Sequence, residues 1–457
     1  MRFDLVIRNG TVATATDTFA ADVGITDGQV VAIGRSLRAG REEIDADHLL
    51  VLPGGIDPHT HLEAAEGDVP AIDDFESGTA AAARGGITTI CDYAWHLPGQ
   101  TIAETVARWR EKAAAKAHVD YGFHVVLGEV TDERLAEFSA TVRAGYPSIK
   151  VFMINEYAVG DAALLHVLAA ARDAGMLVNV HAENGDMIDA RVAEMLAAGC
   201  RDPRYVAESR PALAEVEATR RIVDYAAFTG AEIYVVHVSS GDALAAITAG
   251  RARGVHVWAE TRPIYLALTD ERYAPGGIEA AKLVVAPPLR RKADRDALWA
   301  GLRDGEIQAI GSDNTSWTLA QKAAGLDDFT KVPYGVPGLE TEMRVVFSEG
   351  VAAGRISLNT FVAVFSTNPA RIFGLYPRKG TIAPGSDADF VLFDPGQHGR
   401  IDGRLLASRA GYDPFEGLET TGSPVMTISR GDVIAREGEL LSRPGRGLHL
   451  LRNRTTA

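Results

Sequence analysis

Two histidines separated by one residue, His59 and His61, are the first residues in the chain whose type and spacing suit a chemical role. They follow an apolar stretch at 52–57, and side chains two apart on an extended segment point to the same side. Two imidazoles on one side reach a single cation, which suits zinc or a similar borderline metal. Because a His-x-His pair is a weak signal alone, a metal site needs further ligands.

Two further histidines, His181 and His237, each terminate an apolar stretch, at 177–181 and 233–237. A titratable side chain at the end of a buried strand loses hydration free energy unless it has a partner. One satisfied core histidine is ordinary, but three strand ends that converge on one place are better explained by a shared ligand. The four histidines together therefore predict a metal site.

An acid and a lysine stand in comparable positions. Asp313 ends the apolar stretch 307–313; alone it fits a helix N-cap or a salt bridge, but beside four histidines it is a candidate metal ligand and general base. Lys150 lies inside the apolar stretch 148–153, where a lysine is rarely tolerated without a partner. Its ammonium cannot bind a metal, whereas a carbamate formed with carbon dioxide is an anion whose two oxygens can bridge two cations.

The elements that position these residues form the middle of the chain, 53–375. Short continuous apolar strands follow Ala-rich helical stretches such as 162–174 and 214–229. This alternation is typical of a parallel sheet buried on both faces, and the length favours a closed (β/α)8 TIM-like barrel over an open sheet. In such barrels the functional residues lie at the carboxyl ends of the strands.

The two ends of the chain have a different, all-β texture. Segments 1–52 and 376–440 contain short strands and turns, with strand ends expected at Asn9-Gly10 and Asp27-Gly28. We expect them to form one small β-sandwich domain built from both termini. The remaining tail, 441–457, is interpreted as a flexible arm or an interface strap.

The composition of the chain argues against several classes of function. The 457 residues are 46% hydrophobic and carry a net charge of −15 without a dense Lys/Arg stripe, so nucleic acid is not an expected partner. Two cysteines, Cys91 and Cys200, do not make a disulfide framework. The amino-terminal residues do not resemble a signal peptide, and no apolar run is long enough to span a bilayer. A cytoplasmic protein without a membrane partner is expected.

The order His-x-His, Lys, His, His, Asp resembles the amidohydrolase superfamily. The segments at 55–61, 180–186 and 368–380 are similar in particular to its hydantoinase and dihydropyrimidinase branch. The resemblance extends over nearly the whole chain, including both β ends.

The resemblance implies a binuclear metal centre, with zinc as the expected metal, and a set of roles. His59 and His61 bind the more buried metal with Asp313; His181 and His237 bind the second; carboxylated Lys150 bridges the two. A hydroxide between the metals is the implied nucleophile, and Asp313 passes its proton to the leaving ring nitrogen. The implied reaction opens hydantoin- or dihydropyrimidine-like rings to N-carbamoyl amino acids. A homotetramer or homodimer is also implied.

The residues expected around the substrate depart from the branch. Hydantoinases typically carry a tyrosine at position 155, which hydrogen-bonds the developing oxyanion; here it is Asn155, with Tyr157 two residues further. Loss of an oxyanion donor costs roughly 100- to 1000-fold in turnover. Four other substrate-contact candidates differ from the usual residues: Arg262 in place of cysteine, Ala286 of serine, Asn314 of histidine and Tyr334 of asparagine. A guanidinium at Arg262 suits either a substrate carboxylate or a structural salt bridge. We therefore expect an atypical ring preference.

Alternative functions remain open. An allantoinase, a dihydroorotase or another cyclic imide or amide hydrolase fits the same ligands. Deaminases of the superfamily are disfavoured because many use one metal and lack the residue equivalent to Lys150. A non-catalytic scaffold is disfavoured because all six ligand positions are filled.

Overall fold

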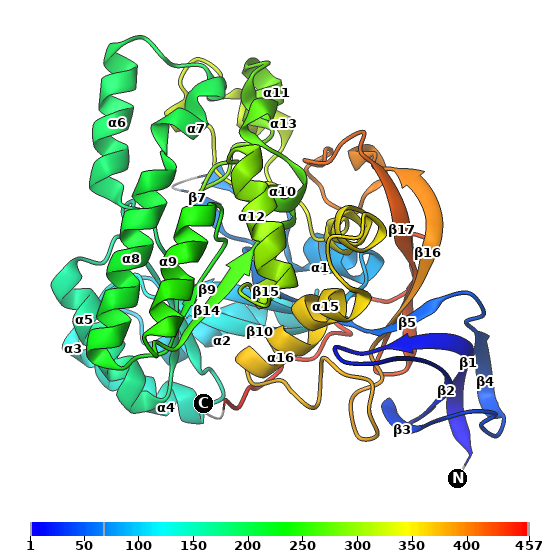
Figure 1. Ribbon diagram of the computed structural model, residues 1–457. Helices are drawn as coiled ribbons and strands as arrows, with labels where there is room; N and C mark the ends of the chain where they lie inside the picture. The colour runs from blue at the N-terminus through cyan, green and yellow to red at the C-terminus, as the bar shows by residue number, and fades with distance from the viewer. Residues whose placement is uncertain (1, 67–68, 455–457) are drawn as a thin grey trace.

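The computed structural model describes residues 2–66 and 69–454. Within them the chain is an α/β fold, with a parallel barrel and a sheet at its side (Figure 1). The amino-terminal end lies in this sheet, at the right of Figure 1, and the carboxyl-terminal end lies beneath the barrel. The predictions for 1–52, 53–375 and 441–457 extend onto Met1, 67–68 and 455–457, which are outside the described residues.

Eight parallel strands of the described residues form one sheet, in the order β15-β14-β13-β12-β11-β10-β9-β6. The sheet closes between its two outer strands, β6 and β15. The amide of Asp313, just after β15, donates to the His59 carbonyl at 2.8 Å, and Thr60 pairs with Asn314. The predicted barrel is therefore confirmed. The strands are β6 (Gly55–Thr60), β9 (Ile87–Trp95), β10 (Asp120–Val126), β11 (Ser148–Phe152), β12 (Leu177–His181), β13 (Ile233–Val235), β14 (Val257–Thr261) and β15 (Ala309–Ile310).

Helices surround the barrel because its strands are buried on both faces and need apolar cover. Every residue of β10, β11 and β12 is buried. The two helices expected from the Ala-rich stretches are confirmed as α5 (Asp161–Ala174) and α8 (Ala212–Thr229). Other long helices are α1 (Phe75–Arg84), α2 (Ile102–Ala114), α6 (Gly185–Ala197), α9 (Gly241–Ala252) and α12 (Lys292–Arg303).

Shorter elements connect these units. The short α-helices are α3 (Asp132–Ala136), α4 (Phe138–Arg143), α7 (Val206–Ser209), α10 (Pro263–Ala267), α11 (Gly277–Ala281), α13 (Leu319–Ala323), α14 (Glu342–Val346), α15 (Leu358–Val362) and α16 (Asn368–Ile372). A two-stranded ribbon, β7 (Ala65–Glu66) and β8 (Val69–Pro70), follows His61. No helix of the described residues combines the length and apolar character needed to cross a membrane.

Strands from both ends of the chain share a nine-stranded sheet, counted over the described residues. They are β1 (Phe3–Ala13), β2 (Thr18–Thr26), β3 (Gln29–Gly34), β4 (Gly40–Asp45), β5 (Leu50–Pro53), β16 (Phe390–Arg400), β17 (Glu419–Ser429), β18 (Asp432–Arg436) and β19 (Glu439–Leu440). β5 pairs with β1 and with β16, so it joins the two halves. Side chains of both halves, such as Ile7, Val23, Phe390 and Ile428, form one apolar core.

One of the two predicted turns is wrong. Asp27 and Gly28 do connect β2 to β3, with φ of 51° and 71°. At Asn9, in contrast, β1 continues to Ala13. Asn9 takes a φ of 58°, and the pairing with β2 shifts register between Ile7 and Gly10, so the dipeptide forms a bulge within one strand.

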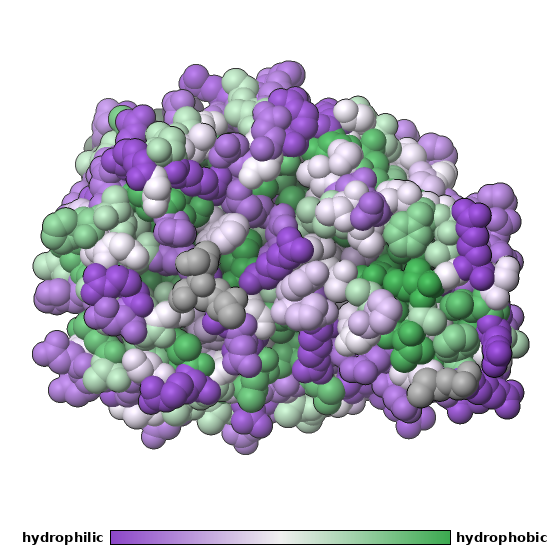
Figure 2. Space-filling model, turned by 60° about the horizontal axis from the view of Figure 1, so that its bottom comes forward, coloured by the Kyte–Doolittle hydropathy of each residue, from purple (hydrophilic) through white to green (hydrophobic). Residues whose placement is uncertain are grey.

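The described part of the tail, 441–454, packs on the amino-terminal ends of the barrel strands. Leu450 donates its amide to the carbonyl of Tyr121 at 2.7 Å, the second residue of β10. Arg452 is fully buried and donates to the Ser148 hydroxyl at 2.8 Å, at the start of β11. Figure 2 turns the bottom of the molecule forward, where polar residues alternate with small apolar areas over the barrel. The tail is thus attached to the barrel of its own chain.

Candidate metal centre and substrate cavity

The six candidate ligands meet at the carboxyl ends of the barrel strands, where barrel proteins carry their function. They are His59 in β6, His61 just after it, Lys150 in β11, His181 at the end of β12, His237 after β13 and Asp313 after β15. All of the imidazoles and Lys150 are buried.

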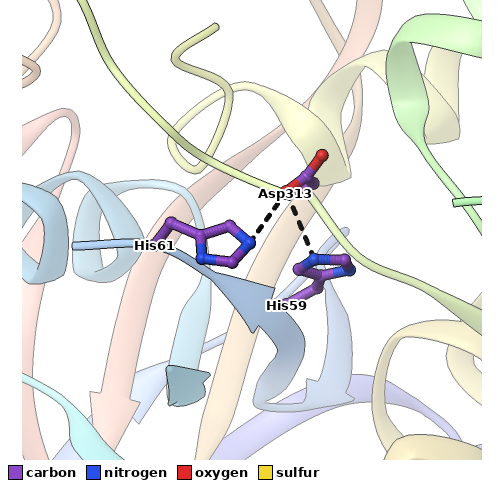
Figure 3. A group of neighbouring side chains, drawn as sticks. All are labelled: His59, His61 and Asp313. Atoms are coloured by element: carbon purple, nitrogen blue, oxygen red, sulfur yellow. Dashed lines mark ion pairs between the residues drawn. The ribbon is translucent and has the colours of Figure 1, made fainter. Parts of the chain in front are cut away.

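His59, His61 and Asp313 form the tightest group (Figure 3). Asp313 Oδ1 lies 3.2 Å from His59 Nε2 and 3.3 Å from His61 Nε2. The donor atoms of these three side chains lie within 4.8 Å of one another, which is compatible with a single ion between them. His61 Nδ1 is buried and has no hydrogen-bond partner among the described residues. Burial lowers the pKa of His61 to about 3, so its ring is neutral and has a lone pair to offer a metal.

Glu260, in β14, orients His59. Nδ1 of His59 donates to Glu260 Oε1 at 2.6 Å, so the lone pair of Nε2 faces Asp313 and Lys150. Glu260 also accepts the amide of His237 at 3.0 Å and the hydroxyl of Tyr234 at 2.9 Å. Burial lowers the pKa of His59, but the negative charges of Glu260 and Asp313 together outweigh the effect of burial, and the pKa is raised.

Lys150 lies between the two histidine groups. Its Nζ donates to His59 Nε2 at 2.9 Å and stands 4.2 Å from the centre of the Tyr93 ring. Burial lowers the pKa of Lys150 to about 8 although Asp313 and Glu260 oppose the shift. The neutral amine is therefore more populated near neutral pH than in an exposed lysine.

His181 and His237 form the second group, with ring centres 4.5 Å apart. His181 Nε2 donates to Glu183 at 2.8 Å, which leaves the Nδ1 lone pair free for a metal. Arg210 donates in turn to Glu183. Burial lowers the pKa of both histidines, so both rings are neutral.

A cavity of about 310 Å³ opens above these groups. Lys150, His181, His237, His61 and Asp313 line its floor, and His59 lies buried beneath them. Of the substrate-contact candidates, the described lining includes Asn155, Tyr157, Ala286 and Tyr334. Aromatic rings dominate the wall. The Trp95 ring stacks on the Phe152 ring with 5.7 Å between the ring centres, and it packs on the Tyr157 ring with 5.0 Å between the centres.

Two candidates lie elsewhere. Arg262 is buried and directed at Asp313 rather than at the cavity, with Nη1 3.0 Å from Asp313 Oδ2. Asn314 is also buried, and its side chain donates to Ser316 at 3.2 Å and accepts the Gly338 amide at 3.0 Å. Neither side chain is thus among the residues that line the cavity, and the geometry favours the salt-bridge interpretation of Arg262.

The sequence reasoning missed the carboxylates that orient the ligands. Glu260 is an acid inside the apolar strand β14, and the burial rule that singled out Lys150 applies to it equally. Glu183 follows His181 by two residues, within the segment used for the resemblance. Arg210 gives no local sequence signal, because only the fold brings it to Glu183.

The residues present fit two divalent ions of borderline type. Neutral imidazoles and a carboxylate are preferred zinc ligands, and two of the histidines are held by an acid through their other nitrogen, His59 by Glu260 and His181 by Glu183. A second acidic cluster, Asp120, Asp387 and Asp389, already has a cation at its centre, since Lys379 Nζ lies 2.7, 3.0 and 2.7 Å from the three carboxylates. Fold and site together define a (β/α)8 barrel protein with a candidate metal centre.

Comparison with known proteins identifies the family. The model of the amidohydrolase family matches residues 50–434. A D-hydantoinase of Geobacillus stearothermophilus is 44% identical over 452 residues, covering 98% of this chain and 96% of the relative. The crystal structure of a dihydropyrimidinase from Brevibacillus agri NCHU1002 is 44% identical, with a TM-score of 0.96 and 98% of each chain covered. An L-hydantoinase (dihydropyrimidinase) from Arthrobacter aurescens is 32% identical, with a TM-score of 0.92 and 98% and 100% coverage.

The chain therefore belongs to the amidohydrolase family and, within it, to the hydantoinase branch. The resemblance stated from the sequence is confirmed.

Proposed function

We propose that the protein is a cyclic amide hydrolase that opens hydantoin- or dihydropyrimidine-like rings to N-carbamoyl amino acids. The observation that carries the proposal is the convergence of three imidazoles, one lysine and one carboxylate on the floor of one cavity, with a fourth imidazole, that of His59, buried beneath them. Relatives named D-hydantoinase and dihydropyrimidinase, similar over almost the whole chain, support it.

The six ligand candidates hold two divalent ions, with zinc as the proposed metal. His59, His61 and Asp313 hold one ion, and His181 and His237 hold the other. When bound, such ions supply an activated water at neutral pH and polarise the ring carbonyl.

Lys150, once converted to a carbamate, would be the residue that holds both ions. The neutral amine forms a bond to the carbon of carbon dioxide and loses one proton, which yields an anion with two oxygens. The lowered pKa of Lys150, about 8, supports this step because only the neutral amine reacts. The position of Nζ, 2.9 Å from His59 Nε2, supports a bridging site.

Asp313 carries the proton. Its Oδ1 faces His59 and His61, whereas Oδ2 keeps one lone pair beyond the Arg262 contact. As the water oxygen bonds to the ring carbonyl carbon, Asp313 Oδ2 accepts the proton that the water loses. It then delivers this proton to the ring nitrogen as the C–N bond breaks.

Asn155, Tyr157, Ala286 and Tyr334 contact the ring or its substituent. Asn155 and Tyr157 are on the loop after β11, and the Tyr157 ring packs on Trp95. Because position 155 lacks the tyrosine usual in the branch, the preferred ring differs from plain hydantoin and dihydrouracil. The aromatic wall supports a substituted ring.

Further features complete the proposal. The chain divides into a small β-domain (1–52 and 376–440), a barrel (53–375) and a tail (441–457). It forms a homotetramer or a homodimer in the cytoplasm.

The experiment is turnover of a panel of rings by protein of known metal content. Hydantoin, dihydrouracil, 5-substituted hydantoins, allantoin and cyclic imides are supplied, and products are identified by mass. Conversion of a hydantoin or dihydropyrimidine to the N-carbamoyl acid is expected, and the double variant His59→Asn, His61→Asn serves as the inactive control. Release of ammonia without ring opening, or no turnover of any ring by protein with both metals bound, would contradict the proposal.

A further inference from the structure

Arg262, the first residue after β14, is one of the largest fully buried side chains in the described part of the molecule. Only 1% of the residue is exposed, and it is not among the residues that line the substrate cavity. A buried guanidinium keeps its charge and needs several acceptors. The identity of its acceptors therefore decides its role.

Arg262 pairs with the segment that carries Asp313, and the Tyr265 ring lies beside its guanidinium, with the ring centre 5.6 Å from Cζ. Arg262 Nη1 lies 3.0 Å from Asp313 Oδ2, as an ion pair without an aligned hydrogen bond. Nε donates to the Ser312 carbonyl at 3.0 Å, and Nη2 donates to the Asp313 carbonyl at 3.3 Å. One side chain thus holds both the backbone and the carboxylate of Asp313.

Asp313 needs such support because its backbone is in the left-handed region, with a φ of 49°. A residue with a Cβ atom disfavours this region, and surrounding contacts must hold it there. The conformation turns the carboxylate toward His59 and His61, with Oδ1 3.2 and 3.3 Å from their Nε2 atoms. Arg262 contacts the other oxygen, so the two sides of the carboxylate have separate partners.

A role in binding a substrate carboxylate does not fit this geometry. All three guanidinium nitrogens are directed at Ser312 and Asp313, and Arg262 is not among the residues that line the cavity. Movement of Arg262 toward a substrate would leave the buried Asp313 without its cation, which is costly.

We propose that Arg262 is a positioning residue that holds Asp313 in its left-handed conformation, with Oδ1 on the metal side and Oδ2 available for proton transfer. The inference rests on the proposed function for its kinetic consequence. Its consequence for metal binding depends only on the ligand role of Asp313.

The test compares Arg262→Gln and Arg262→Lys with a matched pair at Arg251, a residue of helix α9 that contacts the opposite end of β14. Arg251 likewise donates to two backbone carbonyls, those of Val257 and Glu306, and pairs with the Glu306 carboxylate at 2.9 Å. Arg251→Gln and Arg251→Lys therefore remove similar contacts without touching Asp313. Zn²⁺ affinity is measured by chelator competition. The constants kcat and KM are measured with the ring that the wild type opens best, and Tm is measured on the metal-free proteins.

We expect Arg262→Gln to weaken Zn²⁺ affinity about 10- to 100-fold, the usual effect of losing a residue that orients a ligand. At saturating Zn²⁺, kcat falls by a similar factor while KM changes less than about threefold, because Arg262 does not contact the substrate. Arg262→Lys recovers part of both losses, since it keeps the charge but not the fork of donors. The Arg251 variants lower Tm and leave Zn²⁺ affinity and kcat unchanged.

Zn²⁺ affinity of Arg262→Gln equal to that of Arg251→Gln would overturn the inference. A rise in KM confined to acidic substrates would overturn it too, in favour of substrate recognition. If the wild type opens no ring, the proposed function fails, whereas the Zn²⁺ measurements still decide the role of Arg262.

Discussion

Glu260→Gln is the substitution that tests most directly how the first histidine is oriented. Glu260 is fully buried and accepts from His59 Nδ1 at 2.6 Å and from the His237 amide at 3.0 Å, both through Oε1. A glutamine of the same shape retains both acceptor contacts through its carbonyl oxygen. The Tyr234 hydroxyl, which now donates to Oε2, can turn to accept from the new amide nitrogen. The substitution therefore removes the charge and little else.

The size of the effect follows from the hydrogen bonds that His59 Nδ1 and the His237 amide donate to Glu260, because their acceptor loses its negative charge. A hydrogen bond to a charged group contributes about 1 kcal/mol more than a neutral one, so the loss is about 2 kcal/mol. At 1.36 kcal/mol for each factor of ten, this corresponds to about 30-fold. We expect Zn²⁺ affinity, measured by chelator competition, to fall by about this factor in Glu260→Gln.

A matched control is Glu215→Gln. Glu215 is also buried and accepts the amides of Ser239 and Ser240 at 2.8 and 3.3 Å, but it contacts no candidate ligand ring. This variant is expected to lose thermal stability, because Arg290 loses its ion-pair partner, and to keep Zn²⁺ affinity. Unchanged Zn²⁺ affinity in Glu260→Gln, or an equal loss in Glu215→Gln, would refute the reasoning.

Two further predictions concern the bridge and the tail. Lys150→Met is expected to reduce bound metal from about two ions per chain to one or none and to lower turnover more than about 100-fold. Lys322→Met, which changes a lysine equally buried but bonded to backbone carbonyls, should keep the metal; two metals and activity in Lys150→Met would exclude the bridging role. In the tail, burial lowers the pKa of His449 to about 4, and the positive charges of Arg110 and Arg452 add to this shift. The packing of the neutral His449 ring on the barrel therefore stabilises the tail fully above pH 6.5, and this stabilisation is lost as the pH falls toward 4. Because the ring is partly exposed we expect about 1–2 kcal/mol, seen as lower protection factors of the tail amides at pH 5 than at pH 8, each taken relative to intrinsic exchange at the same pH; His449→Gln should abolish this difference, and an equal pH effect in that variant would contradict the assignment.

Much of this architecture was predictable from patterns of residues a few positions apart. Continuous apolar strands between Ala-rich helices predicted the barrel, and the polar residues at their ends predicted which side chains meet. Lys150 and His181 were found because a charged or titratable group in a buried strand demands a partner. The same rule, applied to Glu260, finds the residue that orients His59.

Contacts that depend on three-dimensional closeness were not predictable. Arg262 was expected to contact either a substrate carboxylate or a structural salt-bridge partner, and only the turn after β14 directs it to Asp313, 51 residues later in the chain. Nothing local marks Arg210 as the partner of Glu183. Asn9-Gly10 has a turn composition, yet it forms a bulge because β2 continues to pair on both sides of it.

The measurement that tests the central claim most directly is metal content per chain of freshly purified protein, paired with turnover across hydantoins, dihydropyrimidines, allantoin and cyclic imides. The binuclear account predicts about two divalent ions per chain and ring opening of one ring class. In the double variant His59→Asn, His61→Asn it predicts a loss of bound metal and a loss of ring opening. Absence of metal even after addition of zinc and bicarbonate, with no turnover, would contradict the account.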